Sequence, residues 1–307
     1  MPFKTIHDQH HHFGWDNAFE PVLTIEPGDE VEFGIVDASG GQLTAASTTA
    51  DVATLDFAKV NPVTGPVRIL GAEPGDAIAI EVLGFEPSGW GWTALIPGFG
   101  LLADEFPEPA LHVSRYDEKH VEFLPGVRIP TRPFTGTIGL APAERGLHSV
   151  VPPREVGGNL DIRDVVEGST LFLPVQVPGA LFSVGDTHAC QGDGEVCGTA
   201  VETAMRVRLR FDVKKGSPIR RPQYTVPDEA TRVSKGGFHA TTGVSPDLMT
   251  ASRDAIRDMI EHIGREYGLA PELAYMLCSV AVDLKISEIV DAPNWVVSAQ
   301  LPKGIFA

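Results

Sequence analysis

The stretch Met205-Arg-Val-Arg-Leu-Arg-Phe-Asp-Val213 alternates apolar with charged side chains. Successive side chains of a β-strand point to opposite faces of a sheet, so this pattern predicts a strand with one buried and one solvated face. Runs rich in apolar and β-branched residues precede it, among them residues 77–82 and 170–175. Together these runs predict that most of the chain is β-structure.

The tetrapeptide Glu-Pro-Gly-Asp occurs twice, at residues 26–29 and 73–76, each time between β-rich runs. Proline followed by glycine at the centre of four residues is the signature of a type II turn, because proline fixes φ and glycine accepts a positive φ. We therefore expect each copy to connect two strands.

The texture of the sequence changes after residue 215. Ser245 is a suitable N-cap and Pro246 suits the first helical position, so a helix is predicted to begin there. Gly268 can close its C-terminus. A second helix is predicted from Pro271 to about Leu284. The apolar residues that recur at helical spacing in the first helix are Ile256, Met259, Ile260, Ile263 and Tyr267.

These patterns predict a β-rich α+β fold. Residues 1–215 are expected to form a β-sandwich or barrel-like body that carries the active site, and residues 216–307 a smaller α+β portion. The two portions can equally form one integrated catalytic unit.

The composition narrows the classes of function. The formal net charge is -17, with 24 basic against 41 acidic residues. Nucleic-acid binding and docking on anionic membranes both need clustered Lys and Arg, so neither is expected. Three cysteines form no disulfide framework, and no apolar run is long enough for a membrane span. We expect a cytoplasmic protein with reduced thiols.

The segment Gly185-Asp-Thr-His-Ala-Cys-Gln-Gly-Asp-Gly-Glu195 concentrates chemically active side chains at the end of a short apolar run. Asp186 and His188 are two residues apart, so in an extended segment both point to one face and can bind one metal ion. The alternative is a calcium- or water-lined turn, or an acidic surface loop. His188 and Gln191 favour the functional interpretation, because a solvated acidic loop needs neither.

Two further places offer candidate ligands. His10, His11 and His12 are consecutive and cannot all face one site, so we expect one to be functional and two to be solvated; the alternative is an irregular arm with exposed imidazoles. Asp51 follows small hydroxyl residues, which could orient its carboxylate. The alternative for Asp51 is a plain loop or a helix cap.

Nucleophilic catalysis finds less support. The sequence contains no Gly-x-Ser-x-Gly elbow for a catalytic serine. Cys190 is two residues from His188, but the segment has no lysine for a Cys-Glu-Lys arrangement. We therefore favour a buried packing thiol for Cys190.

The chain resembles the acetamidase/formamidase family from end to end. The segments that carry the resemblance are His12-Phe-Gly-Trp15, Thr49-Ala-Asp-Val52, Pro62-Val-Thr-Gly-Pro66, Gly157-Gly-Asn-Leu-Asp161, residues 178–195 and Cys197-Gly-Thr-Ala-Val-Glu202. The resemblance implies a β-rich homo-oligomer, a dimer or larger, that hydrolyses formamide, acetamide or similar short amides to the acid and ammonia. It also implies a divalent metal ion, with zinc favoured over calcium.

The resemblance suggests a first set of site residues, whose individual roles are our hypothesis. The expected set is His12, Asp51, Asp186 and His188 as metal ligands, with Glu195 as the general base. Two other readings stay open: a hydrolase of other small amides or imides on the same scaffold, and a non-catalytic metal-containing protein that binds a small molecule.

Five neighbouring residues complete the expected site. Asp193 would orient a ligand, and Gln191 or backbone N–H groups near Gly192 would hold the developing oxyanion. Trp15 and Phe13 would wall off a small substrate pocket.

Overall fold

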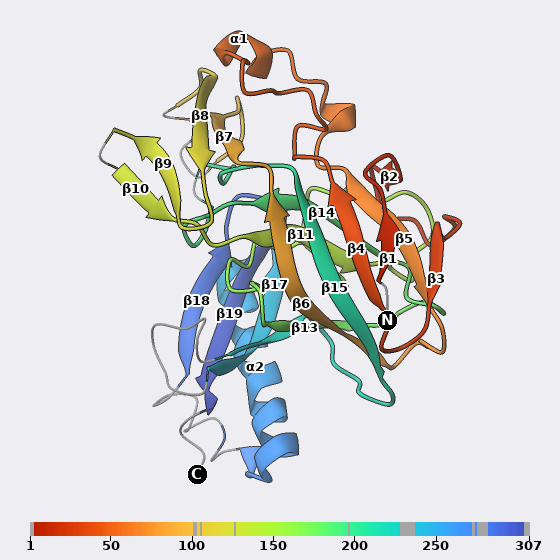
Figure 1. The fold of residues 1–307 in the computed structure, drawn as a ribbon. Coiled ribbons are helices and arrows are strands. Elements are labelled where there is room, and N and C mark those ends of the chain that lie inside the picture. Colours follow the sequence, from red (N-terminus) through yellow and green to blue (C-terminus); the bar gives the residue numbers. More distant parts are fainter. Residues whose placement is uncertain are drawn as a thin grey trace.

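The computed structural model describes residues 3–303 except 101, 102, 105, 126, 196, 228–236, 272, 273 and 275–281. Three sheets and one long helix make up this part of the chain (Figure 1). The predicted β-rich α+β class is confirmed. None of the described helices is long and apolar enough to cross a membrane.

The largest sheet has nine strands and runs through both predicted portions of the chain. Adjacent strands in this sheet are antiparallel except for the first pair, β1 and β4, which is parallel. In spatial order its strands are β1 (Lys4–Ile6), β4 (Glu30–Ile35), β15 (Met205–Lys214), β6 (Ala77–Pro87), β13 (Thr170–Pro174), β16 (Gln223–Val226), β17 (Phe238–Ser245), β19 (Trp295–Pro302) and β18 (Asp283–Glu288).

The second sheet has six strands, and a four-stranded sheet stands beside it. The six are β12 (Gly157–Asn159), β11 (Phe134–Leu140), β14 (Phe182–His188), β5 (Val63–Ile69) and β2 (His11–His12), with β3 (Leu23–Ile25) also pairing with β5. The four are β10 (Val127–Pro130), β9 (His120–Leu124), β8 (Ala110–Tyr116) and β7 (Trp90–Leu95).

The main core lies between the nine-stranded and the six-stranded sheets. Phe33 on β4 and Phe211 on β15 both meet Phe182 on β14 edge-to-face, with ring centroids 5.6 and 4.8 Å away. The predicted alternation of β15 is confirmed, since its apolar side chains are buried while its arginines face outward. This packing fixes β14, and β14 carries the functional segment.

Both Glu-Pro-Gly-Asp copies form the predicted connections. The first joins β3 to β4 and the second joins β5 to β6. Gly28 and Gly75 have φ of 94° in each case, the conformation that a type II turn requires of its third residue. In both copies the final aspartate accepts a hydrogen bond from the backbone N–H of the first glutamate, at 2.9 Å. The repeated sequence is therefore a repeated turn.

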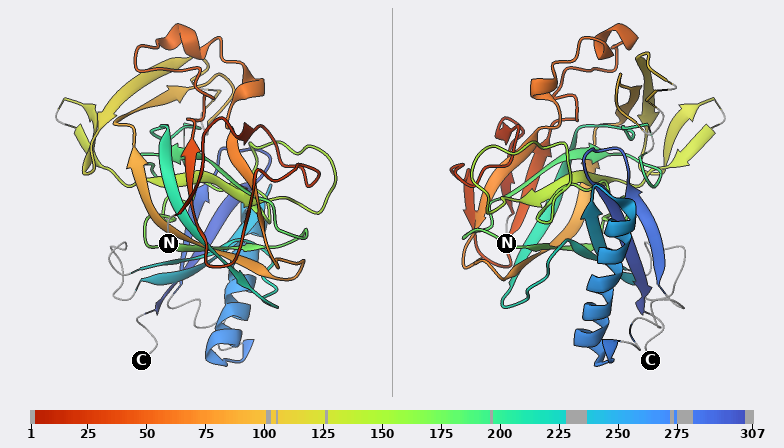
Figure 2. Two further views of the ribbon diagram at one scale, coloured as in Figure 1. Left: turned by 45° about the vertical axis from the view of Figure 1, so that its right-hand side comes forward. Right: turned by 180° about the vertical axis from the view of Figure 1, so that it is seen from behind.

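Helix α2 (Leu248–Tyr267) packs against β17 and β19, near one end of the nine-stranded sheet. The right-hand view of Figure 2 shows the helix beside these strands. Gly268 closes it in the left-handed conformation, as predicted. The predicted N-cap is wrong: Ser245 ends β17, where it pairs with β19, and Asp247 caps the helix by accepting from Thr250 N–H at 2.7 Å.

The helix predicted from Pro271 lies largely outside the described residues, and its predicted end at Leu284 is wrong. Leu284 belongs to β18, where it pairs with β19. Two short elements, α1 (Thr49–Val52) and η1 (Phe57–Lys59), lie at the opposite end of the molecule from α2 (Figure 1).

Candidate active site

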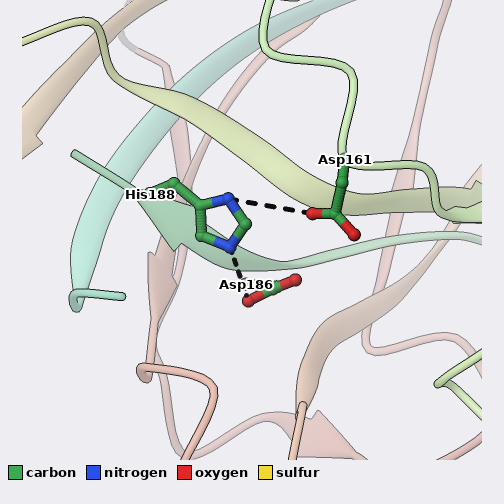
Figure 3. Close-up of side chains that lie close together, drawn as sticks. All are labelled: Asp161, Asp186 and His188. Atoms are coloured by element: carbon green, nitrogen blue, oxygen red, sulfur yellow. Dashed lines mark hydrogen bonds and ion pairs between the residues drawn. The ribbon is translucent and has the colours of Figure 1, made fainter. Parts of the chain in front are cut away.

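Strand β14 delivers Asp186 and His188 into the interior of the molecule. Every residue of this strand is buried, so its polar side chains must find partners inside the protein. His188 Nε2 lies 3.1 Å from an oxygen of Asp186 and 3.0 Å from an oxygen of Glu202. His188 Nδ1 lies 3.7 Å from an oxygen of Asp161 (Figure 3). One imidazole therefore stands among three buried carboxylates.

Three more buried carboxylates lie beside this group, on Glu195, Glu288 and Asp291. Asp291 accepts a hydrogen bond from the Asn159 amide at 2.5 Å. Glu288 accepts from the backbone N–H of Asp291 at 2.6 Å. The first contact attaches the β18–β19 connection to the end of β12, and the second lies within that connection.

The backbone of the cluster is unusual. Asp161, Asp186 and Glu195 have φ of 46°, 55° and 48°, in the left-handed region that non-glycine residues rarely adopt. Asn61, which lines a cavity that opens onto this cluster, has φ of 50°. Residues held in such conformations cluster at functional sites, because the surrounding structure must sustain their strain. The backbone thus supports a functional role for this cluster.

The carboxylates strongly perturb one another's acidity. Burial, with repulsion from Asp186, raises the pKa of Asp161 to about 6. Burial also raises the pKa of Glu202 and of Glu288 to about 8. For Glu195 and Asp291, burial and neighbouring carboxylates move the pKa well above the usual range. Such shifts are typical of catalytic and metal-binding sites.

His188 behaves in the opposite way. Burial disfavours its charged form, but Glu202 and Asp186 together raise its pKa well above the usual value. The same attraction lowers the pKa of Asp186 in spite of its burial. A cation at this position is therefore strongly favoured, whether it is a proton on the ring or a metal ion.

Several polar atoms of the cluster have no hydrogen-bond partner. They are both carboxylate oxygens of Asp161 and one oxygen of Glu288, and Asp161 Oδ1 faces His188 Nδ1 only at 3.7 Å. Buried charges in proteins are normally paired or bound to metal ions. One ligand atom from each of Asp161, Asp186 and His188 lies within 4.8 Å of the others, and the same holds for His188, Glu195 and Glu202. These donors fit a divalent cation.

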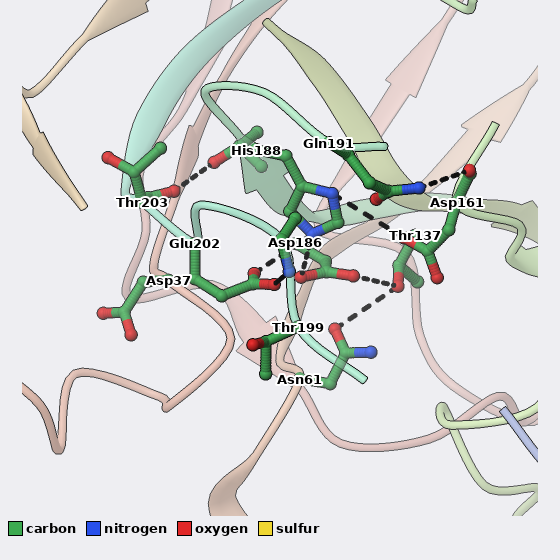
Figure 4. Close-up of polar contacts among 12 residues, drawn as sticks. Asp37, Asn61, Thr137, Asp161, Asp186, His188, Gln191, Thr199, Glu202 and Thr203 are labelled. Carbon is green, nitrogen blue, oxygen red and sulfur yellow. Dashed lines mark hydrogen bonds and ion pairs between the residues drawn. The ribbon is translucent and has the colours of Figure 1, made fainter. Parts of the chain in front are cut away.

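A cavity of about 80 Å³ opens onto the cluster. Its polar side carries carboxylates and amides, of which Figure 4 shows several around His188. A cavity needs roughly 10–15 Å³ of such space to hold one water, so this one accommodates a small ligand. The polar lining consists of Ser39, Asn61, Asn159, Asp186, Glu195, Thr199, Glu202 and Asp291, and the apolar lining includes Leu55, Phe57, Trp92, Ile96 and Phe99.

Of the predicted metal ligands, Asp186 and His188 lie together in this cluster. His12 lies outside it: its ring nitrogens contact Gly14 O at 2.7 Å and Ser183 Oγ at 2.9 Å. Burial lowers the pKa of His12 to about 4, so its ring is neutral at pH 7. Asp51 also lies apart, at the start of α1.

The Asp51 carboxylate accepts a hydrogen bond from Thr48 N–H at 2.6 Å and one from the Thr48 hydroxyl at 3.1 Å. This is a capping box, the alternative that the sequence left open. The side chain is exposed and serves the helix end.

The other predicted residues are dispersed. Glu195 lines the cavity. Gln191 donates to the backbone carbonyl of Asp161 at 2.9 Å, and Asp193 forms an ion pair with Lys285 at 2.9 Å. Gly192 is exposed. Gln191, Gly192 and Asp193 do not line the cavity.

The two predicted pocket walls lie elsewhere in the structure. Trp15 is 2% exposed and packs in an apolar group with Val63 and Val150, while Phe13 is 37% exposed and contacts His11. Neither lines the cavity, whose apolar wall comes from other segments.

Sequence reasoning assigned no role to Asp161, Glu202, Glu288 or Asp291. Asp161 and Glu202 end two of the segments that carried the family resemblance, so a signal for both was present. Asp291 is 96 residues from the nearest motif residue, Glu195. Only the pairing of β18 with β19 brings it to the site, and no local spacing encodes that.

Neither of the two described cysteines, Cys190 and Cys197, belongs to the ligand groups of the cluster. Cys190 is buried among apolar side chains, and burial raises the pKa of its thiol to about 11. A thiol with so high a pKa is protonated at neutral pH and is a poor nucleophile. This agrees with the packing interpretation. Cys278 lies outside the described residues.

Comparison with known proteins gives a match along the whole chain. The sequence profile of the acetamidase/formamidase family matches residues 3–150 and 143–307. A formamidase from Methylophilus methylotrophus is 28% identical, over 96% of this chain and 89% of its own. An acetamidase from Mycolicibacterium smegmatis is also 28% identical, over 87% of this chain and 84% of its own.

Comparison with solved structures also finds an acetamidase among the similar proteins. A crystal structure of an acetamidase from Bacillus halodurans superposes with a TM-score of 0.89 at 31% identity, covering 98% of each chain. A gamma lactamase from Delftia acidovorans superposes less closely, with a TM-score of 0.70 at 27% identity, covering 97% of this chain and 90% of its own.

Proposed function

Because this chain belongs to the acetamidase/formamidase family and is an amidase, we propose that it hydrolyses short aliphatic amides with the help of a divalent metal ion. Formamide and acetamide are the proposed substrates, and the carboxylate and ammonia the products. The observation that carries the proposal is the buried His188, surrounded by carboxylates and facing a cavity of about 80 Å³.

Asp186, His188 and Glu202 would hold the ion. They supply one imidazole nitrogen and two carboxylate oxygens, a donor set that favours zinc over calcium, which prefers oxygen ligands alone. A bound zinc ion supplies Lewis acidity and lowers the pKa of water to about 7. His12 and Asp51 have no place in this set, since the first bonds to Ser183 and the second caps α1.

Glu195 would move the proton. Its carboxyl lines the cavity and is buried, and its raised pKa makes the ionised form a stronger base than an ordinary carboxylate. A group of this kind takes a proton from the attacking water and returns it to the departing nitrogen. Amide nitrogen leaves only when protonated, so this transfer is needed for the C–N bond to break.

Asn61 is better placed than Gln191 to bind the amide oxygen. Its side-chain oxygen lies 3.3 Å from the Thr137 hydroxyl and its side chain lines the cavity, so its amide nitrogen would donate to the substrate. Gln191 already donates to the Asp161 carbonyl. A donor aimed at the carbonyl oxygen stabilises the charge that develops there.

The size of the cavity supports the choice of substrate. Trp92, Phe57 and Phe99 bound it with large apolar side chains, so bulky acyl groups are excluded. The likeness to a gamma lactamase makes small cyclic amides a second class to test, although the volume favours the smaller linear amides.

The first test measures ammonia release from formamide, acetamide, propionamide, benzamide and a γ-lactam. Glu195→Gln keeps the shape of the side chain and removes its proton transfer, so kcat is expected to fall about 10²–10⁴-fold. Asp212→Asn, which alters an exposed carboxylate paired with Lys214, is the matched control and retains wild-type turnover. Unchanged turnover in Glu195→Gln would remove Glu195 from the mechanism.

The second test removes the metal. Protein treated with chelator and dialysed is expected to lose ammonia release, and added Zn²⁺ to restore it. Elemental analysis of the same samples relates activity to bound metal. Full turnover in a sample that contains no metal contradicts the metal-assisted mechanism but leaves the amidase activity intact.

We also propose that the protein is a cytoplasmic homo-oligomer that binds neither nucleic acid nor membranes. The net charge of -17 supports the last two points, because both surfaces are polyanionic. Light scattering after size exclusion measures the mass of the particle. A single 32.9 kDa species at micromolar concentration would contradict the oligomer.

A further inference from the structure

The carboxylates around His188 divide into two sets of possible ligands. Asp186 and Glu202 both approach Nε2 of His188, at 3.1 and 3.0 Å. A separate set consists of Asp161, Glu195 and Asp291, of which one oxygen each lies within 4.8 Å of the others. No residue of the first set belongs to the second.

Unpaired buried oxygens point to a ligand at the second set. Asp161 is 1% exposed, and neither of its carboxylate oxygens has a hydrogen-bond partner. Glu288, fully buried beside Asp291, has one oxygen in the same condition. Carboxylate oxygens buried without a hydrogen-bond donor are disfavoured when they carry charge. A cation relieves several such oxygens at once.

The second set is also held rigidly from three parts of the chain. The Asn159 amide donates to Asp291, and Gln191 donates to the backbone carbonyl of Asp161. The N–H of Gly194, next to Glu195, donates to the Ser287 carbonyl at 3.1 Å. A site whose ligands are fixed before binding loses little entropy when it binds.

We propose that Asp161, Glu195 and Asp291 bind a second divalent cation beside the ion at Asp186, His188 and Glu202. The inference rests on the proposed metal-assisted function and adds a second metal position to it. Because the second set offers only oxygen, it selects a hard cation of the Mg²⁺, Mn²⁺ or Ca²⁺ class, whereas the imidazole of the first favours zinc.

Two residues connect the positions. Asp161 lies in a ligand group with Asp186 and His188 as well as in the one with Asp291, and Glu195 lies in one with His188 and Glu202. Each carboxylate has two oxygens, so each can face both cations. In such paired sites the two ions act together on the attacking and the departing atoms. Glu195 then holds a cation with one oxygen and handles the proton with the other.

The experiment counts bound metal directly. Chelator-treated full-length protein is titrated with Mn²⁺, which accepts both nitrogen and oxygen ligands, and binding is followed by calorimetry and electron paramagnetic resonance. Wild type is expected to bind two equivalents and to show the spectrum of a spin-coupled pair. Asp291→Asn is expected to bind one equivalent with the spectrum of an isolated ion, and so is Glu202→Gln.

Asp212→Asn is the matched control and is expected to keep both equivalents. One equivalent in the wild type, or two in Asp291→Asn, overturns the second site. The wild-type count decides the matter even where a variant fails to fold, which circular dichroism reports. Ammonia release is measured in parallel: two equivalents without amide hydrolysis would overturn the proposed function and leave the second site standing.

Discussion

Gly136 on β11 shows how tightly the site is built at the scale of one residue. A Cβ there would lie 2.4 Å from Asp161 Oδ1, 2.6 Å from Asp186 Oδ2 and 2.8 Å from His188 Cε1. Such separations are shorter than van der Waals contact. The missing side chain is therefore what lets two carboxylates and the imidazole converge on this strand.

Gly136→Ala is expected to disable the site more than it unfolds the protein. The methyl group displaces Asp161 and Asp186, so ammonia release should fall at least ~100-fold, in line with the effect of small misplacements on catalysis. Overpacking of this kind costs about 1–3 kcal/mol of unfolding free energy. Urea denaturation and steady-state kinetics measure the two effects separately.

Gly264→Ala serves as the control, because Gly264 lies inside α2 with its nearest neighbour at 3.5 Å. Alanine stabilises a helix interior by about 0.5–1 kcal/mol over glycine. Should Gly136→Ala retain full turnover, the convergence of the three side chains on β11 would not matter to the chemistry.

At the scale of elements, the wall of the cavity comes from η1 and from the segment after β7. Phe57 and Phe99 stack with ring centroids 5.6 Å apart and an interplanar angle of 14°. Both line the cavity. Their pairing therefore limits the length of the acyl group that can enter.

Phe99→Ala is expected to shift selectivity toward longer amides. Removing one ring lengthens the cavity, so the ratio of kcat/KM for propionamide to that for acetamide should rise about 10-fold, the value of roughly one methylene. Competition between the two amides measures this ratio directly. Phe106→Ala, which alters an exposed phenylalanine that does not line the cavity, should leave the ratio unchanged. An unaltered ratio in Phe99→Ala would show that this wall does not set selectivity.

A stacked pair of histidines lies where α2 meets β17. The rings of His239 and His262 stack with centroids 3.6 Å apart and planes inclined by 4°. Burial lowers the pKa of His262 to about 4, and nearby Arg265 contributes. Burial, with the charges of His262, Lys303 and Arg265, lowers the pKa of His239 as well. Both rings are therefore neutral in the folded protein at pH 7.

This pair should make the protein less stable in acid. A lowered folded pKa means that the unfolded chain binds more protons, so the stability is present above about pH 6.5 and is lost as pH falls toward 4. His262→Phe keeps the stacking and removes one titrating ring. Its unfolding free energy should fall less steeply than that of wild type over this window, by up to ~1.4 kcal/mol per pH unit.

Urea denaturation at several pH values gives both slopes, and the comparison cancels the contribution of the carboxylate cluster. His120→Gln, which changes an exposed histidine, should follow wild type. Parallel curves for wild type and His262→Phe would contradict the role assigned to the pair.

The elements also show what local sequence can and cannot predict. The alternation in β15, both type II turns and the C-terminus of α2 were predictable, because neighbours in sequence determine them. The start of α2 was not, because pairing with β19 extends β17 through Ser245 and moves the cap to Asp247. Pairing of β18 with β19 likewise places Leu284, the predicted end of a helix, in a strand.

At the scale of the molecule, the site was predictable only where its residues are close in sequence. Asp186, His188 and Glu195 belong to one segment, and the fold brings them together. His12 and Asp51 had matching motifs, yet the fold places them against Ser183 and at the start of α1. Asp161 and Glu202 end segments that carried the family resemblance, whereas long-range strand pairing, which no local pattern encodes, supplies Glu288 and Asp291.

The late position of Asp291 in the sequence has a consequence for when the site becomes complete as the chain is made. This carboxylate lies just before β19, the last strand in the chain, which sits between β17 and β18 in the nine-stranded sheet. A nascent chain that has exposed only its first 290 residues holds Asp186, His188 and Glu195 without the partner that completes their surroundings. A chain truncated ahead of Asp291 is therefore expected to release no ammonia, however well its first sheets have formed.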